Sequence, residues 1–533
     1  MKKQTIFKIM LMLLLAFINY YIFLPVINLK AFSFYFYLIL LIIDFFLISM
    51  AFNITDRELR FTTKLRNLPK YILIPMGFII TIVVVIIVIN ILVSPIFNAK
   101  SYSRRINVNE NGNFASDISE VDFSKVPLLD KDSSSKLGDR VMGQYSEYVS
   151  QFYVSDRYTQ INYNDEILRV TPLEYDGFIK WLFNRNNGIG AYITVNSVNG
   201  ETKLIKLDKG IKYSESAMFN DNLARKIRFS YPFTITGEEK FEIDNDGNPY
   251  YIIPTLSYTG ISLKTKVTGA IIFDPITGES KKYDLNDIPK WVDNVYSADL
   301  IIEQVNDWGT YKNGFINSIF GQKNVVNTTE GYNYLALNDD IYLYTGITSV
   351  SSDESNLGFI LSNLRTKETT FYDVAGAEEY SAMESAKGQV QQMNYDSTFP
   401  LLINVNSNPT YLISLKDNAG LVKMYAFVDV RDYQKVSVSD AALGINKALE
   451  NYLKLNVSNN ISDDLLTSEE ITIKSISSAV INSNTNYYIV DSNDNKYNVS
   501  INVSNKLPFV SIGDKLKIYY YSKNDITEII KID

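Results

Sequence analysis

Three long apolar runs fill the first 97 residues of the 533-residue chain, over positions 5–27, 33–53 and 71–97. A helix of about 20 apolar residues crosses the hydrocarbon core of a bilayer, so each run is long enough to span a membrane. Lys2 and Lys3 precede the first run, as in a secretory signal peptide, but no small-residue cleavage site follows and two further runs come next. The pattern therefore predicts a three-helix transmembrane anchor over residues 1–97.

Basic residues are distributed unevenly around these runs. Eight of them lie at the N-terminus and in the loop after the second run: Lys2, Lys3, Lys8, Arg57, Arg60, Lys64, Arg66 and Lys70. The loop after the first run carries only Lys30, although a further group follows the third run: Lys100, Arg104 and Arg105. Because cytoplasmic loops carry the excess of Lys and Arg, we expect a cytoplasmic N-terminus and an extracytoplasmic chain from about residue 98 onward, in the plasma membrane.

Beyond the anchor the apolar runs become short, as in strands bounded by turns. Turn signals such as Asn-Gly and Asp-Gly punctuate them in three segments: 197–203, 242–249 and 274–280. Such signals between apolar runs predict β-hairpins.

Helices are predicted between these runs. The polar segment 98–150 contains one predicted helix, near 133–148. Another is predicted over 171–183, because Thr171 and Glu174 have the spacing of a capping box and Pro172, between them, fits the first helical position. Later helical segments are expected over 288–305 and 439–453.

The region 151–455 contains similar phrases twice. NPYYIIP at 248–254 resembles NPTYLIS at 408–414, and five other pairs follow the same order: 158–167 with 332–341, 191–207 with 358–374, 212–217 with 379–384, Pro232 with Pro400, and 267–275 with 422–430. The offsets fall almost monotonically from 174 to 155 residues. Chance similarity among β-rich segments explains one or two such pairs, whereas six in order indicate two collinear copies, over 151–306 and 307–455.

Each predicted copy consists of a hairpin, a helix and a meander of about three strands, which is an α+β arrangement of a helix on an antiparallel sheet. The second half of each copy resembles the PepSY family, on the basis of a strand that ends in D-P-x-T-G-E at 274–279. The second copy departs from that pattern and has DVRDYQ at 429–434. The resemblance implies inhibition or escort of exported enzymes, and therefore binding rather than catalysis.

The C-terminal unit, residues 465–533, follows the polar linker NVSNNISDD. Its apolar runs predict about five short strands with turns between them. The phrase IGDKLKIYY at 512–520 places a Gly-Asp turn before a buried strand, as in OB-like folds. We expect a small β-barrel, with the OB-like topology preferred.

Composition and charge restrict the function. The first 97 residues hold nine of the 51 basic and three of the 59 acidic residues, so the remainder has a net charge of −14, which argues against nucleic-acid binding. The absence of cysteine, the many asparagines and the preference for Lys over Arg are typical of low-GC Gram-positive bacteria. With neither His nor Cys, the chain cannot form a Ser-His-Asp or Cys-His site, or a zinc site built on those ligands.

Carboxylates are the remaining candidates for catalysis or metal binding. Adjacent acids occur at Glu238-Glu239, Glu378-Glu379 and Glu469-Glu470, and such pairs are usually solvated. Glu242, Asp244, Asp246 and Gly247 imitate the start of an EF-hand loop, but Ile253 occupies the position of the bidentate acid, so a β-turn is favoured. We therefore assign no catalytic residue, no metal ligand and no cofactor.

Two groups remain as candidate binding residues. Tyr175, Phe178 and Trp181 recur at helical spacing, which is usual for a core stripe, although an exposed aromatic face could stack on cell-wall sugars. Asp44 lies near the middle of the second span, where a carboxylate needs a partner, either Asn19 or Lys8 of the first span. The pair Asp44 and Asn19 either packs the anchor together or docks another membrane protein.

Three function classes survive. The first is a non-enzymatic, membrane-anchored scaffold or binding protein that engages another envelope protein. The second is an accessory subunit that joins a membrane complex through its anchor. The third is a carboxylate-based hydrolase of cell-wall polymer, which would require two acids converging in a groove, at least one with a raised pKa.

Overall fold

The structure is a computed structural model that describes residues 2–53, 70–337, 339–350, 352–455, 466–481, 484–504, 506–520, 523 and 525–532. The loop that holds Arg57, Arg60, Lys64 and Arg66 lies outside the described residues, and so does the linker 456–465. The predicted orientation depends on the charges of that loop and therefore stays a prediction.

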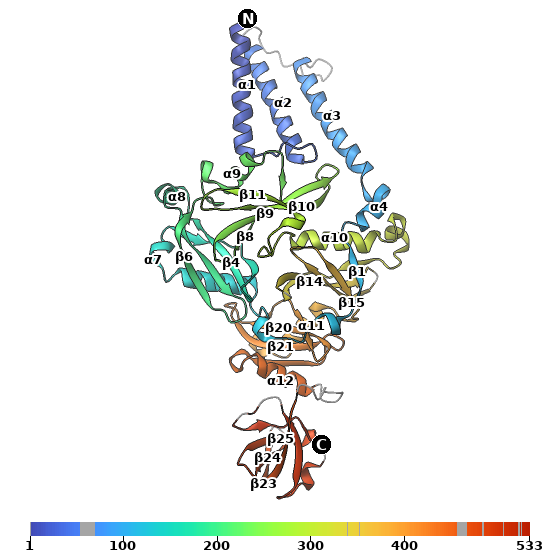
Figure 1. Ribbon diagram of the computed structural model, residues 1–533. Helices are drawn as coiled ribbons and strands as arrows, with labels where there is room; N and C mark the ends of the chain where they lie inside the picture. Colours follow the sequence, from blue (N-terminus) through green and yellow to red (C-terminus); the bar gives the residue numbers. More distant parts are fainter. Residues whose placement is uncertain are drawn as a thin grey trace.

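Three helices are long and apolar enough to cross a membrane: α1 (Lys2–Phe23), α2 (Phe32–Asn53) and α3 (Lys70–Leu92). They project together from one end of the molecule (Figure 1). The third span ends at Leu92, earlier than expected, because Pro95 begins a separate helix, α4 (Pro95–Ser103). Arg105, after α4, forms ion pairs with Glu303 and Asp307, so this cation has a structural partner in the rest of the chain.

Four sheets make up the body, residues 104–455, and their strands pair antiparallel except for β1, which pairs with β16 in parallel. The first contains β2 (Phe152–Val154), β3 (Thr159–Tyr163), β4 (Glu166–Tyr175), β5 (Ile189–Asn196) and β6 (Thr202–Ile211). The second contains β7 (Ile235–Thr236), β8 (Lys240–Ile243), β9 (Pro249–Thr259), β10 (Lys264–Phe273) and β11 (Ser280–Asp284). The third contains β12 (Val326–Thr328), β13 (Asn333–Leu337), β14 (Asp340–Ser349), β15 (Ser352–Asn363) and β16 (Thr369–Tyr372), with β1 (Val108–Gly112) and β17 (Gly376–Ala377) added. The fourth contains β18 (Asp396–Ser397), β19 (Leu401–Val405), β20 (Asn408–Lys416), β21 (Val422–Asp429) and β22 (Val436–Asp440).

The four sheets share one pairing pattern. In each sheet, the third of these strands in chain order is a long one. The residues near the start of this long strand pair with the second strand, and the residues near its end pair with the short first strand. The chain then continues into a meander. In every sheet a gap of two residues of the long strand, paired with neither of these two strands, separates the two paired regions. The gap lies at 171–172, 253–254, 345–346 and 413–414. Tyr251 and Tyr411, from the two similar phrases, both lie buried just before that gap.

Helices precede the sheets and pack against them. They are α6 (Lys131–Met142) and α7 (Ser146–Val149), α9 (Leu223–Ser230), α10 (Ala298–Tyr311) and α11 (Glu379–Gly388), with α5 (Phe114–Asp117) before α6 and α12 (Ile445–Leu455) after the fourth sheet. The second sheet is buried on both faces: Ile253 and Ile271 pack toward the first sheet, whereas Ile252 and Ile272 pack toward α10 and the third sheet. A continuous series of cores therefore joins the four sheets, with the third and fourth sharing the last one.

The predicted helix over 171–183 is wrong in its first half. Residues up to Tyr175 form β4, and only α8 (Phe178–Asn184) is helical. Thr171 and Glu174 do not cap a helix: the Thr171 hydroxyl donates to the Ser155 carbonyl, and Glu174 accepts a hydrogen bond from the Ser216 backbone N–H. Burial of β4 on both faces removes the alternation that distinguishes a strand from a helix in sequence.

Other boundaries also differ. The helices expected over 288–305 and 439–453 begin later, at Ala298 and Ile445, and the helix expected over 133–148 is interrupted between α6 and α7. Each predicted copy contains two sheets rather than one. The three predicted hairpins are confirmed, as β5–β6, β8–β9 and β10–β11.

The C-terminal unit is a curled sheet that resembles half of a barrel, at the opposite end of the molecule from the spans (Figure 1). Its strands are β23 (Thr467–Ile481), β24 (Asn484–Asp491), β25 (Lys496–Ser500), β26 (Lys515–Tyr520), β27 (Thr527–Glu528) and β28 (Lys531–Ile532). The first half of β23 pairs with β26 and the second half with β24, so this strand bends between the two sides around a core of its own.

Candidate functional site

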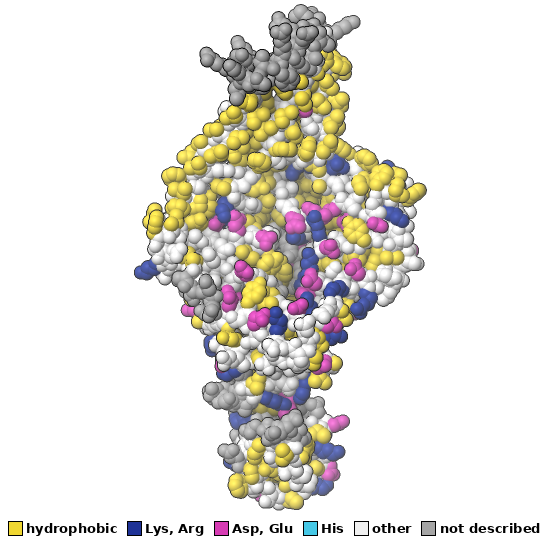
Figure 2. Space-filling view, turned by 180° about the vertical axis from the view of Figure 1, so that it is seen from behind, with side chains coloured by type: hydrophobic (Ala, Val, Ile, Leu, Met, Phe, Trp, Pro, Cys, Tyr) yellow, Lys and Arg dark blue, Asp and Glu magenta, His cyan; other side chains and the backbone are white. Residues whose placement is uncertain are grey.

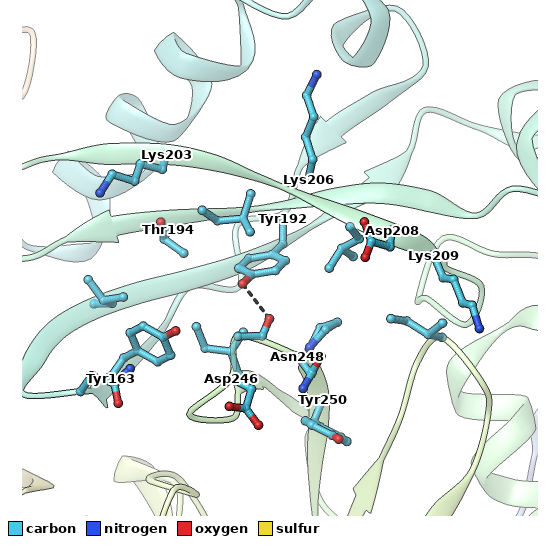
Figure 3. A pocket seen from close by; sticks show the side chains of 18 of the residues that line it. Tyr163, Tyr192, Thr194, Lys203, Lys206, Asp208, Lys209, Asp246, Asn248 and Tyr250 are labelled. Atoms are coloured by element: carbon cyan, nitrogen blue, oxygen red, sulfur yellow. Dashed lines mark hydrogen bonds between the residues drawn. The ribbon is translucent and has the colours of Figure 1, made fainter.

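A groove of about 1010 Å³ lies between the first and second sheets. Figure 3 shows Tyr192 in the middle of this groove, with Lys203 and Lys209 toward its two ends. Asp246 and Tyr250 lie on the opposite wall, which belongs to the second sheet. The groove is therefore built by segments that are separated by tens of residues in the chain.

One wall is a face of the first sheet. Strand pairing sets Tyr192 of β5 opposite Ile205 of β6 and Thr194 opposite Lys203, so these side chains project from the same face. Lys206 points the other way, where its ammonium group lies 5.6 Å from the ring centre of Tyr145. β6 is the last strand of its sheet, and no strand within the described residues pairs with its outer side.

The other wall is the β8–β9 turn. The Asp244 carboxylate accepts hydrogen bonds from the backbone N–H groups of Asp246 and Asn248, and Gly247 adopts φ of +82°. This geometry confirms the predicted turn. The Tyr192 hydroxyl donates to the Gly247 carbonyl at 2.9 Å, so one hydrogen bond joins the two walls.

The chemistry of the groove is mixed. Its lining includes the cations Lys203 and Lys209, and five acids: Glu166, Glu201, Asp208, Asp246 and Asp274. Burial raises the pKa of Tyr192 and of Tyr250, so both phenols stay neutral and can donate or accept hydrogen bonds. Ile205 and Leu207 add apolar surface. Such a groove can hold a polar chain with intermittent apolar groups.

Two pairs of neighbouring acids in the body contain a carboxyl group with a raised pKa. Partial burial and the neighbouring Glu239 raise the pKa of Glu215 to about 8, although Arg157 lies 2.7 Å from Glu215 and 2.9 Å from Glu239. Glu239 belongs to one of the adjacent acid pairs of the sequence, whereas nothing in the sequence marked Glu215, because its partner is 24 positions away. Neither side chain lines the groove.

Glu242 and Asp293 form the other pair, in the interior. Burial raises the pKa of Glu242 to about 7, and burial together with Glu242 raises the pKa of Asp293. Glu242 accepts hydrogen bonds from the backbone N–H groups of Asp293 and Asn294, both at 2.9 Å. Because Glu242 is fully buried, this pair can support the fold but cannot reach a polymer substrate.

The intramembrane candidates lie together. The Asn19 side-chain amide donates to the Asp44 carboxylate at 2.6 Å, which links α1 to α2. Lys8, the alternative partner, instead lies 4.9 Å from the ring centre of Phe52. The hydrogen bond satisfies Asp44 within the anchor, and docking of another membrane protein at this pair stays a prediction.

The aromatic candidates do not share an exposed face. Tyr175 lies at the end of β4 and is 1% exposed, and Trp181 of α8 is 2% exposed. Phe178 is the exposed member of the three, at 46%. Tyr175 and Trp181 are therefore core residues, and the exposed face of α8 is formed by its other apolar side chains.

No group of three acidic side chains in the described part of the chain is arranged to hold a metal ion. No family model matches the chain, and no curated protein matches its sequence. The argument for function therefore starts from the groove itself.

Proposed function

We propose that the chain is a membrane-anchored extracytoplasmic binding protein of the cell envelope, and that it engages a segment of another envelope protein in the groove between the first and second sheets. The observation that carries the proposal is the groove of about 1010 Å³, open along an unpaired strand edge. Its acids, lysines and neutral tyrosines suit recognition of a polypeptide without requiring a catalytic group.

The edge of β6 supports a polypeptide ligand. An edge strand presents backbone N–H and C=O groups that an extended segment can pair with, while pockets beside it select side chains. Lys203, Lys206 and Lys209 along β6 protect the edge from indiscriminate pairing. Because the lining holds more acids than lysines, the groove as a whole favours a partner segment that carries basic residues.

Internal duplication is part of the proposal. The shared strand order and the recurring two-residue gap support two copies of a two-sheet unit, with NPYYIIP and NPTYLIS at equivalent positions. On this view the copies keep the helix-plus-sheet character of PepSY-like modules, and the C-terminal curled sheet is an OB-like module. The cytoplasmic N-terminus and extracytoplasmic body remain the preferred orientation.

A photoreactive amino acid at position 163 tests the groove in living cells. Tyr163 lines the groove and is partly buried, whereas Tyr433, in the turn after β21, is 43% exposed and serves as the control position. We expect one abundant envelope protein to crosslink at position 163 and not at 433. Identical products from both positions, or wall fragments without protein, would contradict the proposal.

Charge reversal sharpens the experiment. Glu166→Lys with Asp246→Lys should weaken the position-163 crosslink severalfold, because both acids line the groove and the groove would then repel a basic segment. Glu470→Lys is the control, since Glu470 is exposed on the C-terminal sheet. Equal loss in both variants would show that the effect is not specific to the groove.

A second candidate function is an accessory subunit that docks through the anchor. An apolar hollow of about 430 Å³ between the three spans favours it, with Leu41, Phe45 and Phe78 in its lining. A hydrolase is favoured only by Glu215 and Glu239, where burial and the neighbouring carboxylate raise the pKa of Glu215 outside the groove, although Arg157 contacts both acids.

A further inference from the structure

Two exposed apolar patches flank the spans on the body. The first is the outer face of α8, where Phe178, Ile179, Leu182 and Phe183 are 42–79% exposed. The second lies in the helical turn η6 (Asn317–Gly321) and just before it, where Ile316, Ile319 and Phe320 are 50–81% exposed. We call them the α8 patch and the η6 patch. Side chains this large and apolar are rarely gathered on a surface that faces only water.

Both patches continue the surface of the membrane-spanning helices. Figure 2 shows hydrophobic side chains that extend from the spans onto both shoulders of the body. Figure 1 places α8 on one side, near the end of α1, and the segment after α10 on the other side, beyond α3 and α4. The spans therefore stand between the two patches.

Intervening elements link each patch to a span. Phe219, which is 57% exposed, lies 6.5 Å from Phe178 between ring centres and precedes α9. Phe229 of α9 lies 5.3 Å from Tyr20 of α1, so the α8 patch is linked to the first span. The segment 219–229 therefore contacts the α8 patch at one end and the first span at the other.

The η6 patch is linked to the third span in the same manner. It follows α10, which packs against α4, the continuation of α3. The Tyr102 and Tyr311 rings, from α4 and α10, are 5.8 Å apart, and Arg105 reinforces the joint through its ion pairs with α10. These contacts therefore fix the position of the η6 patch along the axis of α3.

Charge distinguishes these patches from the rest of the acidic body. Residues 177–187 contain Lys180 and Arg185 and no acid, and residues 308–329 contain Lys312 and Lys323 and no acid. Apolar faces whose own segments carry cations and no acid are typical of segments that lie in the headgroup region of anionic bilayers, and here the nearest acids in the chain, Asp176, Asp307 and Glu330, lie at the edges of the two segments. A protein partner would not require both patches to border the spans.

We propose that the α8 patch and the η6 patch insert into the headgroup region of the leaflet from which the body projects, with anionic phospholipid as their occupant. The body then rests on the membrane at two points beside its spans. This contact fixes the tilt of the body and the direction in which the groove opens, and it does not depend on what the groove binds.

The absence of cysteine allows a direct test in the full-length protein. Phe183→Cys and Phe320→Cys, each labelled with an environment-sensitive fluorophore, report the two patches after reconstitution into vesicles of phosphatidylglycerol and phosphatidylcholine. Phe509→Cys is the control, because Phe509 is 83% exposed on the distant C-terminal unit. We expect a lipid-borne nitroxide near the headgroup to quench both patch labels about twofold or more beyond the control.

Each other outcome overturns the proposal. Quenching equal to that of the control would place the patches in water. A blue-shifted emission without lipid quenching would identify a protein occupant or a second copy of the chain. Equal quenching in vesicles of phosphatidylcholine alone would remove the preference for anionic lipid. Ile179→Cys and Ile319→Cys, at 58% and 50% exposure, repeat the measurement if either phenylalanine variant misfolds.

Discussion

At the scale of single residues, Glu242 and Asp293 link the stability of the body to pH. Both pKa values are raised in the fold, that of Glu242 to about 7, so the folded chain keeps protons that the unfolded chain releases above pH 4 to 5. The pair makes its full contribution to the free energy of unfolding below the pKa values that these groups have in the unfolded chain. This contribution is lost as the pH rises toward 7. The loss is on the order of 3 kcal/mol for a shift of this size.

Asp293→Asn is predicted to flatten this pH dependence. Asn can still accept the hydrogen bond that the Asn162 backbone N–H donates to Asp293 at 2.6 Å, while the repulsion with Glu242 disappears. Thermal unfolding in detergent at pH 5 and pH 8 should show a smaller difference for the variant than for the wild type. Asp246→Asn removes an exposed charge and should leave the difference unchanged. An equal difference between pH 5 and pH 8 in Asp293→Asn and in the wild type would contradict the assignment of this pH dependence to Glu242 and Asp293.

At the scale of secondary-structure elements, the β8–β9 turn sets one wall of the groove. Gly247→Ala places a side chain at φ of +82° and brings Cβ to 3.5 Å from the Tyr192 hydroxyl. We expect a loss of about 1–2 kcal/mol in the free energy of unfolding, because L-residues are strained in the left-handed region. Denaturant unfolding measures it.

Gly388→Ala is the matched control for this substitution. Gly388 ends α11 without positive φ and with no neighbouring atom within 4 Å of an added Cβ. Alanine there should leave stability unchanged or raise it by up to about 1 kcal/mol. Equal effects at positions 247 and 388 would mean that the turn conformation does not matter.

The sequence predicts some elements better than others, because only some of them depend on residues that are close together in the chain. The spans and the three hairpins depend on length and turn chemistry within a few residues, and both could be predicted. β4 could not, because a strand buried on both faces shows no alternation, and Thr171, Pro172 and Glu174 mimic a helix start. Packing of NPYYIIP against the first sheet could not be predicted either, because it depends on residues that are distant in the chain.

The candidate sites follow the same rule. Asn19 and Asp44 could be paired from sequence because both stand out as polar residues within apolar spans. The groove could not be predicted, since Tyr192 and Gly247 are 55 positions apart and neither is unusual in composition. The sequence shows the α8 segment as an aromatic run, but only the structure shows which of its side chains are buried and which are exposed.

At the scale of the whole molecule, the cores divide the chain into parts. The three cores of the body use residues from Ile106 to Leu453, and the C-terminal sheet has a separate core around Ile489 and Val499. The body and the C-terminal sheet are connected by ion pairs of Glu528 with Lys447, at 3.8 Å, and with Lys454. Partly exposed ion pairs contribute about 0–1 kcal/mol each, so the parts should unfold almost independently.

Two fragments test this independence. Residues 95–533 keep α4 and all four sheets without the spans, and residues 95–455 also lack the linker and the C-terminal sheet. We expect the main thermal transition of both fragments to be cooperative and to differ by no more than a few degrees, because the three main cores keep all their residues and both fragments lose the same small cluster of Val26 and Ala31 against Ile235. Calorimetry should also show a second, smaller transition in the longer fragment alone. A body that melts without cooperativity, or only together with the C-terminal sheet, would refute this division of the chain.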